Sequence, residues 1–354
     1  MSPTAMIVTR TPYRISFFGG GTDYPGWFRD HGGSVLATTI NRYCYINCRL
    51  LPPFFEHKSR IVWSRIESVL DHSEIVHPSI RAVLQTLQIA QGVEIHHHGD
   101  LPARSGLGSS SAFTVGVLHA IHAMRGQLVG KRTLAEEAIY IEQEVLKENV
   151  GVQDQIQTAF GGFNRIDIAR DGQFEVRPLC LTQERIRSLE SNLLLFYTGV
   201  ARDASNVAAA QVAAIPQRKS ELRDLGGLVD EAAAILSGSG DIREFGRLLH
   251  QSWQIKRTLT DKIAPAFVDE IYDAAIAAGA NGGKLLGAGG GGFMLFFVEA
   301  DRRKGVVDAL KRLLSVPFTC ERHGSQIIFY EPNGFLGDGE TSSREYVRYG
   351  FDNN

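Results

Sequence analysis

Residues 102–112 read Pro102-Ala-Arg-Ser-Gly-Leu-Gly-Ser-Ser-Ser-Ala112, and they lie between a strand-like segment and an apolar helical segment. Gly106 and Gly108 allow the backbone to approach a ligand closely. The serines at 109–111 supply hydroxyls and are expected to N-cap the helix, whose N-terminus offers free N–H groups and a positive dipole end. An ordinary capped loop needs only one serine. This stretch therefore predicts a binding site for an anion.

Two familiar nucleotide-binding motifs can be tested against the sequence. No Gly-Lys-Ser/Thr follows the glycines of residues 102–112, so this is not a Walker A loop and another kind of phosphate cradle is implied. The letters Gly287-Ala-Gly-Gly-Gly-Gly292 satisfy the dinucleotide fingerprint, but a strand-like run follows them, whereas the fingerprint requires a helix. We expect a glycine-rich hairpin that closes against a ligand or another backbone, or else a purely structural turn.

A further glycine-rich stretch, Arg14-Ile-Ser-Phe-Phe-Gly-Gly-Gly-Thr-Asp23, lies near the N-terminus. Its arginine can bind a charged group, and its aspartate can accept hydrogen bonds from hydroxyls. The stretch suits a site for a charged and hydroxylated ligand, and a surface turn is the alternative.

The segment 133–148 is predicted to form a helix with a carboxylate on its apolar face. At about 100° of rotation per residue, Glu142 falls near the middle of the face formed by Leu134, Ala135, Ala138, Ile139, Ile141, Val145 and Leu146. A carboxylate on a buried face costs several kcal/mol unless it is paired or binds a metal. Glu142 therefore requires a cation, either a metal ion or an arginine in a structural salt bridge.

Asp154 follows this helix in the short polar segment Gly151-Val-Gln-Asp-Gln155, which we expect to be a loop. A loop carboxylate close to a phosphate cradle can accept a hydroxyl proton or orient a nucleophile. An exposed loop acid without a function is the alternative.

The composition is that of an ordinary globular protein. The 354 residues suggest about two domains, with 44% apolar and 21% charged residues. No segment is apolar over the roughly 20 residues that a membrane helix requires, and residues 1–11 lack the features of a signal peptide. We expect a cytoplasmic protein with no membrane partner.

Charge and cysteine content narrow the class of ligand. The 37 basic and 39 acidic residues give a net charge of −2, which argues against a nucleic-acid partner and favours a small ligand. The four cysteines form no CxxC pair, so reduced structural thiols are expected rather than a zinc site or disulfides.

The order of predicted elements favours an α+β fold, because strands and helices do not alternate as regular βαβ units. Strands are expected at residues 5–18, 34–50, 92–98, 162–168, 173–180, 192–197, 292–298 and 318–330, the last one broken at His323-Gly324. Helices are expected at residues 77–90, 110–125, 133–148, 204–236, 242–259, 265–278 and 302–314. We place one domain at 1–185, a second at 186–332 and a polar tail at 333–354.

In this order the glycine-rich stretches resemble the GHMP kinases, the family of galactokinase, homoserine kinase, mevalonate kinase and phosphomevalonate kinase. Residues 102–112 look like the family's second motif, the ATP phosphate loop, and GAGGGGFMLFF looks like the third motif. Residues 14–23 look like the first motif in the form found in sugar kinases. The resemblance implies two α+β domains, the first with a left-handed βαβ crossover and the second ferredoxin-like. ATP and substrate would meet in the cleft between them.

The resemblance also implies roles for single residues. Asp154 would be the catalytic base or orienting carboxylate, Arg14 would stabilise the transferring phosphoryl group, and Ser110 and Glu142 would bind Mg²⁺. The ATP-binding residues would be Pro102, Arg104, Ser105, Gly106, Leu107, Gly108, Ser109, Ser110 and Ser111. The substrate would lie at Gly20, Gly21, Asp23, Arg202, Gly289 and Gly290.

The acceptor is expected to be a sugar or sugar phosphate. Galactokinases carry Glu-His where this chain has Gly20-Gly21, so two sugar contacts are missing and a larger acceptor is implied. The segments FFGGGTDYP, LPPFFEH and VGVQDQ are most similar to bacterial family members that phosphorylate the anomeric hydroxyl of D-glycero-D-manno-heptose 7-phosphate. Arg104, Arg202 and Lys284 are candidates for holding an acceptor phosphate.

Three alternatives stay open at this point. The acceptor could be another sugar, such as a fucose-like or galactose-like one. The chain could also be a non-catalytic sensor with the same fold, although Arg14, Ser110, Glu142 and Asp154 are all present. The protein could be a monomer or a homodimer.

Overall fold

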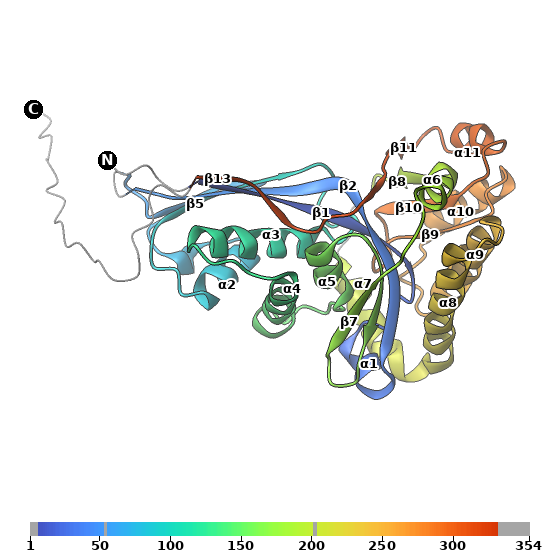
Figure 1. Ribbon diagram of the computed structural model, residues 1–354, viewed down its shortest axis with the longest axis horizontal. Helices are drawn as coiled ribbons and strands as arrows, with labels where there is room; N and C mark the ends of the chain where they lie inside the picture. Colours follow the sequence, from blue (N-terminus) through green and yellow to red (C-terminus); the bar gives the residue numbers. More distant parts are fainter. Residues whose placement is uncertain (1–5, 53–54, 201–203, 332–354) are drawn as a thin grey trace, which may run out of the picture.

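The computed structural model describes residues 6–52, 55–200 and 204–331. These residues form a nine-stranded sheet and a four-stranded sheet, each covered by helices (Figure 1). The expected α+β class is confirmed. The tail at 333–354 and Arg202 lie outside the described residues.

Two long antiparallel strands form the centre of the larger sheet. β1 (Met6–Phe18) pairs with β2 (Gly33–Leu50) along its whole length, from Met6 opposite Arg49 to Phe18 opposite Leu36. The first half of β1 alternates between buried and partly buried residues, whereas every residue from Thr11 onward is buried. Helices cover both faces of the second half, and the functional stretch that starts at Arg14 lies there.

The larger sheet has the central order β13-β1-β2-β5-β3-β4, and β6, β7 and β12 complete it. Its shorter strands are β3 (Ser59–Val62), β4 (Ile66–Val69), β5 (Val93–Gly99), β6 (Phe163–Ile168), β7 (Phe174–Pro178), β12 (Cys320–Glu321) and β13 (Gln326–Glu331). The helices of this part are α1 (Pro25–His31), α2 (Pro78–Thr86), α3 (Ser109–Met124), α4 (Lys131–Ile139) and α5 (Gln153–Phe160). The apolar helix α3 packs against both β1 and β2.

The smaller sheet is antiparallel and has the order β11-β8-β10-β9. Its strands are β8 (Leu193–Tyr197), β9 (Gly282–Leu285), β10 (Phe293–Phe297) and β11 (Leu314–Ser315). The accompanying helices are α6 (Gln183–Asn192), α7 (Ala204–Ala214), α8 (Lys219–Ser237), α9 (Arg243–Lys256), α10 (Ala266–Ala277) and α11 (Arg303–Ala309). Every residue of β9 and β10 is buried: β10 lies between two strands, and the edge strand β9 is covered by α9 and α10.

The end of the described chain returns to the first sheet. β12 pairs with β2, and β13 pairs with β1 as an edge strand. Gly161 and Gly324 meet where this segment passes α5, and a Cβ at Gly161 would overlap the backbone of Gly324. Residues 320–331 therefore join the sheet of the first half, and the division at residue 185 stays a prediction.

Three expectations about local structure are corrected. The predicted helix 133–148 ends as an α-helix at Ile139 and continues as a π-helical turn, Tyr140–Val145. The predicted helix 204–236 is broken between α7 and α8 around Pro216, which cannot donate a backbone hydrogen bond. The segment around Asp154, expected to be a loop, is the start of α5.

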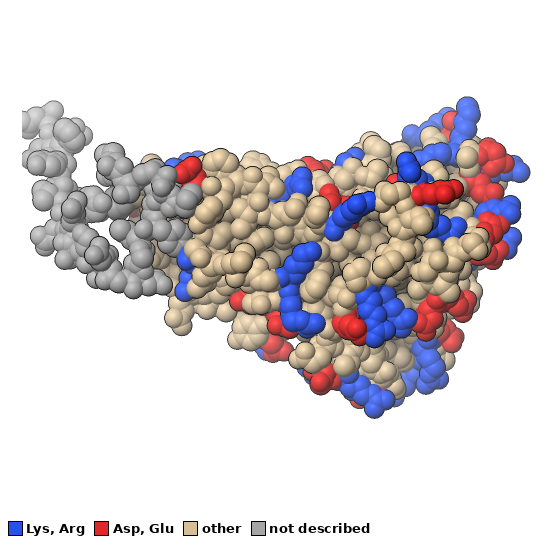
Figure 2. All heavy atoms as spheres, viewed as in Figure 1, with Lys and Arg blue, Asp and Glu red and all other residues tan. Residues whose placement is uncertain are grey.

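No helix among the described residues has both the length and the apolar character to span a membrane. On the face shown in Figure 2, basic and acidic side chains are interspersed, and most of them lie at the end that carries α8–α11. Neither sign forms a continuous stripe on this face.

The substitution Gly161→Ala tests how strongly the returning segment is held. Gly161 has φ +70° and ψ 173°, a conformation that only glycine adopts readily, and a Cβ there has no room. We expect a loss of at least about 2 kcal/mol in the free energy of unfolding, measured by urea denaturation.

Gly227→Ala is the matched control, because Gly227 is exposed within α8 and nothing lies within 4 Å of an added Cβ. It should stabilise the protein by about 0.5–1 kcal/mol. Equal stability of the two variants would contradict the close packing of Gly161 on Gly324.

Candidate active site

Residues 102–112, the candidate phosphate loop, form a loop as far as Gly108 and then the first turn of α3. Gly108 is the N-cap of α3, in a left-handed conformation with φ 72° and ψ 27°. No side chain caps this helix, so the expectation that the serines are N-caps is wrong. The Ser109 hydroxyl instead accepts a hydrogen bond from the Arg104 N–H at 3.1 Å. The left-handed glycine is the physical reason, because it turns the chain into the helix without help from a side chain. The first N–H groups of α3 therefore stay available to a ligand.

The glycine-rich segment 287–292 joins the antiparallel strands β9 and β10, which confirms the expected hairpin. It packs directly on the phosphate loop: the Phe293 N–H donates to the Ser105 carbonyl at 3.1 Å. A Cβ on Gly287 would lie 2.5 Å from the Gly106 Cα, which is closer than real contacts allow. The hairpin thus closes against another backbone, and glycine is required for that approach.

Arg14 links the phosphate loop to Asp154. Its Nε and one terminal nitrogen donate to the two carboxylate oxygens of Asp154, each at 2.6 Å. The other terminal nitrogen donates to the Gly106 carbonyl at 2.6 Å, and the Arg14 N–H donates to the Leu107 carbonyl at 2.9 Å. Arg14 is 4% exposed, so this is a buried, bidentate pair.

Asp154 lies in the first turn of α5, where a carboxylate interacts favourably with the helix dipole. Its side chain keeps 28% of its surface exposed, toward the cavity described below. No helical periodicity is visible in this segment because the buried residues of α5 include Gln153, Gln155 and Gln157, which hide the apolar pattern. The adjacent Gln153 accepts a hydrogen bond from the Ser16 hydroxyl on β1 at 2.8 Å, which fixes this end of α5.

Glu142 is completely buried in the π-helical turn, as its place on the apolar face predicted. Its Oε2 accepts hydrogen bonds from the Ser111 hydroxyl at 2.9 Å and the Gln155 amide at 2.5 Å. Its Oε1 has no partner among the described residues, and no arginine or lysine pairs with it there. Burial raises the pKa of Glu142 to about 7. The salt-bridge alternative is therefore not supported, and one buried carboxylate oxygen is left without a partner.

A cavity of about 780 Å³ connects these features. Of the residues that the sequence singled out, it is lined by Arg14, Gly20, Gly21, Asp23, Arg104, Gly106, Gly108, Ser109, Ser110, Ser111, Asp154 and Lys284. The lining does not include Pro102, Ser105, Leu107, Glu142, Gly289 and Gly290. Glu142 lies behind Ser111, and the Gly290 N–H is bonded to the Ile263 carbonyl at 2.9 Å. Gly287 and Ala288 face the cavity in place of Gly289 and Gly290.

One end of the cavity has an aromatic wall that sequence reasoning missed. The rings of His77 and Phe113 stack at 4.4 Å, and Trp63 meets His77 edge to face at 4.9 Å. Burial lowers the pKa of His77 to about 4, so this ring is neutral near pH 7. His97, on β5, also lines the cavity beside Phe113. The wall is apolar and planar, as a site for a flat ring requires.

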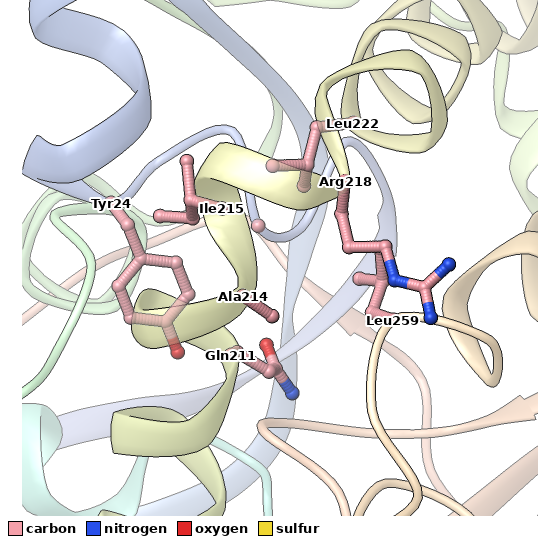
Figure 3. A pocket seen from close by; sticks show the side chains of 8 residues that line it. Tyr24, Gln211, Ala214, Ile215, Arg218, Leu222 and Leu259 are labelled. Carbon is pink, nitrogen blue, oxygen red and sulfur yellow. The ribbon is translucent and has the colours of Figure 1, made fainter.

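The other end of the cavity contains Asp23. Its carboxylate accepts a hydrogen bond from the Gly21 N–H at 2.9 Å, and burial raises its pKa. Gly20 has room for a side chain, since an added Cβ would meet only the Ser16 hydroxyl at 3.6 Å. A smaller pocket continues behind Gly21, between Tyr24, Gln211, Ala214, Ile215, Arg218, Leu222 and Leu259 (Figure 3). The first motif thus leaves space for a larger side chain at Gly20, whereas at Gly21 an added Cβ would lie 2.9 Å from Leu222.

Two basic residues, Lys256 and Lys284, reach this end of the cavity, and only Lys284 is among the residues predicted from sequence. Lys284 extends from β9, and Lys256 is the last residue of α9. Lys256 follows Phe245, Leu249 and Trp253 on the buried face of α9 at helical spacing, which is the same signal that identified Glu142. Applied to α9, that signal would have found Lys256.

Comparison with known proteins agrees with this arrangement. Residues 74–162 match the sequence profile of the GHMP kinases N terminal domain, and residues 229–316 match that of the GHMP kinases C terminal domain. D-glycero-alpha-D-manno-heptose 7-phosphate kinase of Campylobacter jejuni is 29% identical over 322 residues, which cover 86% of this chain and 93% of that protein. Galactokinase of Pyrococcus furiosus is 24% identical over 336 residues, covering 86% and 93%.

A solved structure shares the fold over most of its length. The crystal structure of a D-glycero-D-manno-heptose 1-phosphate kinase from Bacteriodes thetaiotaomicron superposes with a TM-score of 0.75 at 27% identity, covering 90% of this chain and 98% of that one. The two family profiles match one range in each half of the chain, the N-terminal profile first. The chain therefore belongs to the GHMP kinase family and is an ATP-dependent phosphotransferase that acts on a sugar hydroxyl.

Proposed function

We propose that this sugar kinase transfers the γ-phosphoryl group of MgATP to the anomeric hydroxyl of D-glycero-D-manno-heptose 7-phosphate and forms the 1,7-bisphosphate. The observation that carries the proposal is the Arg14–Asp154 pair, which lies in one cavity with the phosphate loop, Gly20 and Gly21. A nucleotide phosphate, a carboxylate and an open acceptor site can meet there without a covalent intermediate.

The nucleotide would occupy the end of the cavity between the phosphate loop and the aromatic wall. The uncapped N-terminus of α3 and the backbone at Gly106 and Gly108 would bind its phosphates. The base would lie against the wall formed by Trp63 and His77, whose neutral ring adds no charge.

Mg²⁺ would be held by Ser110 and Glu142, together with the nucleotide's phosphates. The unpartnered, buried Oε1 of Glu142 fits this role, because a hard cation prefers carboxylate oxygens and would neutralise the buried charge. When bound, the ion would screen the negative charge that develops on the transferring phosphoryl group. Ser111, which binds Glu142 directly, would orient that carboxylate.

Asp154 would accept the proton of the attacking sugar hydroxyl, and Arg14 would hold Asp154 in place. The bidentate contact fixes both carboxylate oxygens, so the carboxylate is oriented before the acceptor arrives. Arg14 also carries positive charge to the loop at Gly106, where the phosphoryl group would pass. Asp23 would bind hydroxyls of the sugar.

The heptose acceptor is favoured by the open space at Gly20 and by the names of two relatives that act on heptose phosphates. A galactose-like acceptor is the second candidate, because a galactokinase is also related over most of the chain. Galactokinases place larger residues at the positions of Gly20 and Gly21. A small hexose would leave that space unfilled.

Replacing Asp154 by Asn tests the proton acceptor. Asn keeps the size of the side chain but cannot take up a proton, so we expect kcat to fall by roughly 10²–10⁴-fold. The Kd for ATP, measured by calorimetry, should change less than about threefold because Asp154 is not part of the phosphate loop.

Asp171→Asn in the exposed turn before β7 is the control and should leave kcat unchanged. Turnover near the wild-type rate in the Asp154 variant would remove this residue from the catalytic role.

Replacing Glu142 by Gln tests the metal site. The variant should need at least about tenfold more Mg²⁺ for half-maximal activity, since an amide is a weaker ligand than a carboxylate. Glu144→Gln is the matched control, because Glu144 lies on the same turn but is exposed and pairs with Lys147. An unchanged Mg²⁺ requirement in the Glu142 variant would exclude it as a ligand.

Because the pKa of Glu142 is raised, the free energy of unfolding in metal-free buffer should depend on pH. The folded protein keeps this proton up to about pH 7, whereas the unfolded chain releases it near its ordinary pKa. Stability from this group is therefore present at low pH and is lost as the pH rises from about 5 to 8, by on the order of 3 kcal/mol. Thermal unfolding with a chelator should show a smaller decline in the Glu142→Gln variant than in the wild type, because the contribution of Glu142 is removed and that of Asp23 stays. A parallel decline in both would contradict the buried, protonated carboxylate.

An ADP-release assay with a panel of acceptors tests the substrate. D-glycero-D-manno-heptose 7-phosphate should give a kcat/KM at least about 100-fold above galactose or fucose, a difference of about 2.7 kcal/mol in transition-state binding. A higher kcat/KM for galactose or fucose would replace the heptose proposal with the second candidate.

A further inference from the structure

Lys256 and Lys284 are two buried cations that the proposed reaction does not yet use. Lys256 is 6% exposed and Lys284 is 2% exposed, and both line the cavity that contains Gly20, Gly21 and Asp23. They reach it from different elements, the end of α9 and the middle of β9. Lysines are rarely buried without a partner, so their place here requires a reason.

Each ammonium group is positioned by one backbone carbonyl. The Lys256 Nζ donates to the Gly287 carbonyl at 2.5 Å, and the Lys284 Nζ donates to the Phe17 carbonyl at 2.7 Å. An ammonium group has three N–H donors, so each lysine has donors left for a ligand. Within residues 6–52, 55–200 and 204–331, neither lysine forms an ion pair with a carboxylate.

The charges at this end of the cavity do not balance. Asp154 is already paired with Arg14, which leaves Asp23 to face both lysines. Burial lowers the pKa of Lys256 to about 8, and burial together with the charge of Lys256 lowers the pKa of Lys284 well below its ordinary value. Buried cations without a counter-charge are costly, and an anionic ligand between them would remove that cost.

We propose that Lys256 and Lys284 form the binding site for the phosphate group of the acceptor, so that the enzyme selects a sugar phosphate over a neutral sugar. This inference rests on the proposed function and names the residues that would determine which acceptor the enzyme prefers. A phosphate offers three acceptor oxygens and up to two negative charges, which match two ammonium groups with free donors.

The position of the two lysines indicates that they bind the phosphate of the acceptor rather than a phosphate of the nucleotide. The phosphate loop and the start of α3 already supply donors for the nucleotide, and neither lysine belongs to them. Lys284 is bonded to Phe17, three residues before Gly20, and it interacts electrostatically with Asp23. Lys284 therefore lies beside the first motif, where the sugar is expected. Lys256, bonded to the Gly287 carbonyl, also interacts electrostatically with Asp23. Of the basic residues named from sequence, Arg104 lines the cavity from the phosphate loop, on the nucleotide's side.

Calorimetric titration without nucleotide tests the pair independently of turnover. The probes are D-glycero-D-manno-heptose 7-phosphate and the same heptose without phosphate, each titrated into the wild type, Lys256→Met and Lys284→Met. We expect the wild type to bind the phosphorylated sugar at least about 100-fold more tightly, and each variant to lose at least about tenfold of that preference. Lys304→Met is the control, since Lys304 is 88% exposed on α11 and pairs with Asp308.

Steady-state kinetics distinguishes whether the lysines bind the phosphate of the acceptor or the γ-phosphoryl group of ATP. If the pair holds the acceptor phosphate, the variants raise KM for heptose 7-phosphate at least about tenfold and leave the constants for unphosphorylated heptose within about threefold. An equal loss of kcat with both acceptors would show that the lysines act on the γ-phosphoryl group and would overturn the proposal. A wild type that does not prefer the phosphorylated sugar in calorimetry would also overturn it.

A separate control for folding is needed, because each Lys→Met substitution also removes a buried hydrogen bond. Lys256→Arg keeps the charge and should keep most of the preference for the phosphorylated sugar, whereas Lys256→Met loses it at a similar melting temperature. If Lys256→Arg and Lys256→Met lost the preference for the phosphorylated sugar to the same extent, a role for the charge would be contradicted. If the enzyme phosphorylates no sugar, the kinase proposal fails, while the calorimetric comparison still decides the role of the lysines.

Discussion

The guanidinium group of Arg14 is the contact on which the site depends. It joins β1 to Asp154 at the start of α5 and to the Gly106 carbonyl in the phosphate loop. Arg14 is buried, so loss of the Asp154 carboxylate would leave the guanidinium charge uncompensated, at a cost of about 3–5 kcal/mol. The phosphate loop, the carboxylate and the central strand are therefore fixed relative to one another before any ligand binds.

Close backbone packing then brings the second half of the chain to this contact. The hairpin that ends at Gly292 lies against Ser105 and Gly106, so β9 and β10 are held beside the phosphate loop. Lys284 adds a bond from β9 to the Phe17 carbonyl of β1. The cavity between the two sheets is consequently bounded by parts of the chain that are far apart in sequence. Its two ends differ chemically, with an aromatic wall at one and buried charges at the other.

Sequence reasoning found the features whose residue types are unusual for their position. The phosphate loop was predicted from serines beside two glycines, and the hairpin from a run of glycines before a strand-like segment. The burial of Glu142 was predicted from its place on an apolar helix face. The start of α5 was missed because its buried residues are glutamines, and the serine caps were wrong because Gly108 turns the chain itself. The pairing of β13 with β1 joins residues more than 300 positions apart, which no local pattern encodes. The roles given to Asp154, Glu142 and Ser110 stay predictions.

A crystal structure of the enzyme with a non-hydrolysable ATP analogue, Mg²⁺ and D-glycero-D-manno-heptose 7-phosphate would show where the γ-phosphate, the anomeric hydroxyl and the sugar's phosphate lie. The account predicts the γ-phosphate at the start of α3, the anomeric hydroxyl within hydrogen-bond distance of Asp154, and the sugar's phosphate on Lys256 and Lys284. A γ-phosphate outside the loop at Gly106, or a sugar whose hydroxyls all lie beyond hydrogen-bond reach of Asp154, would contradict it.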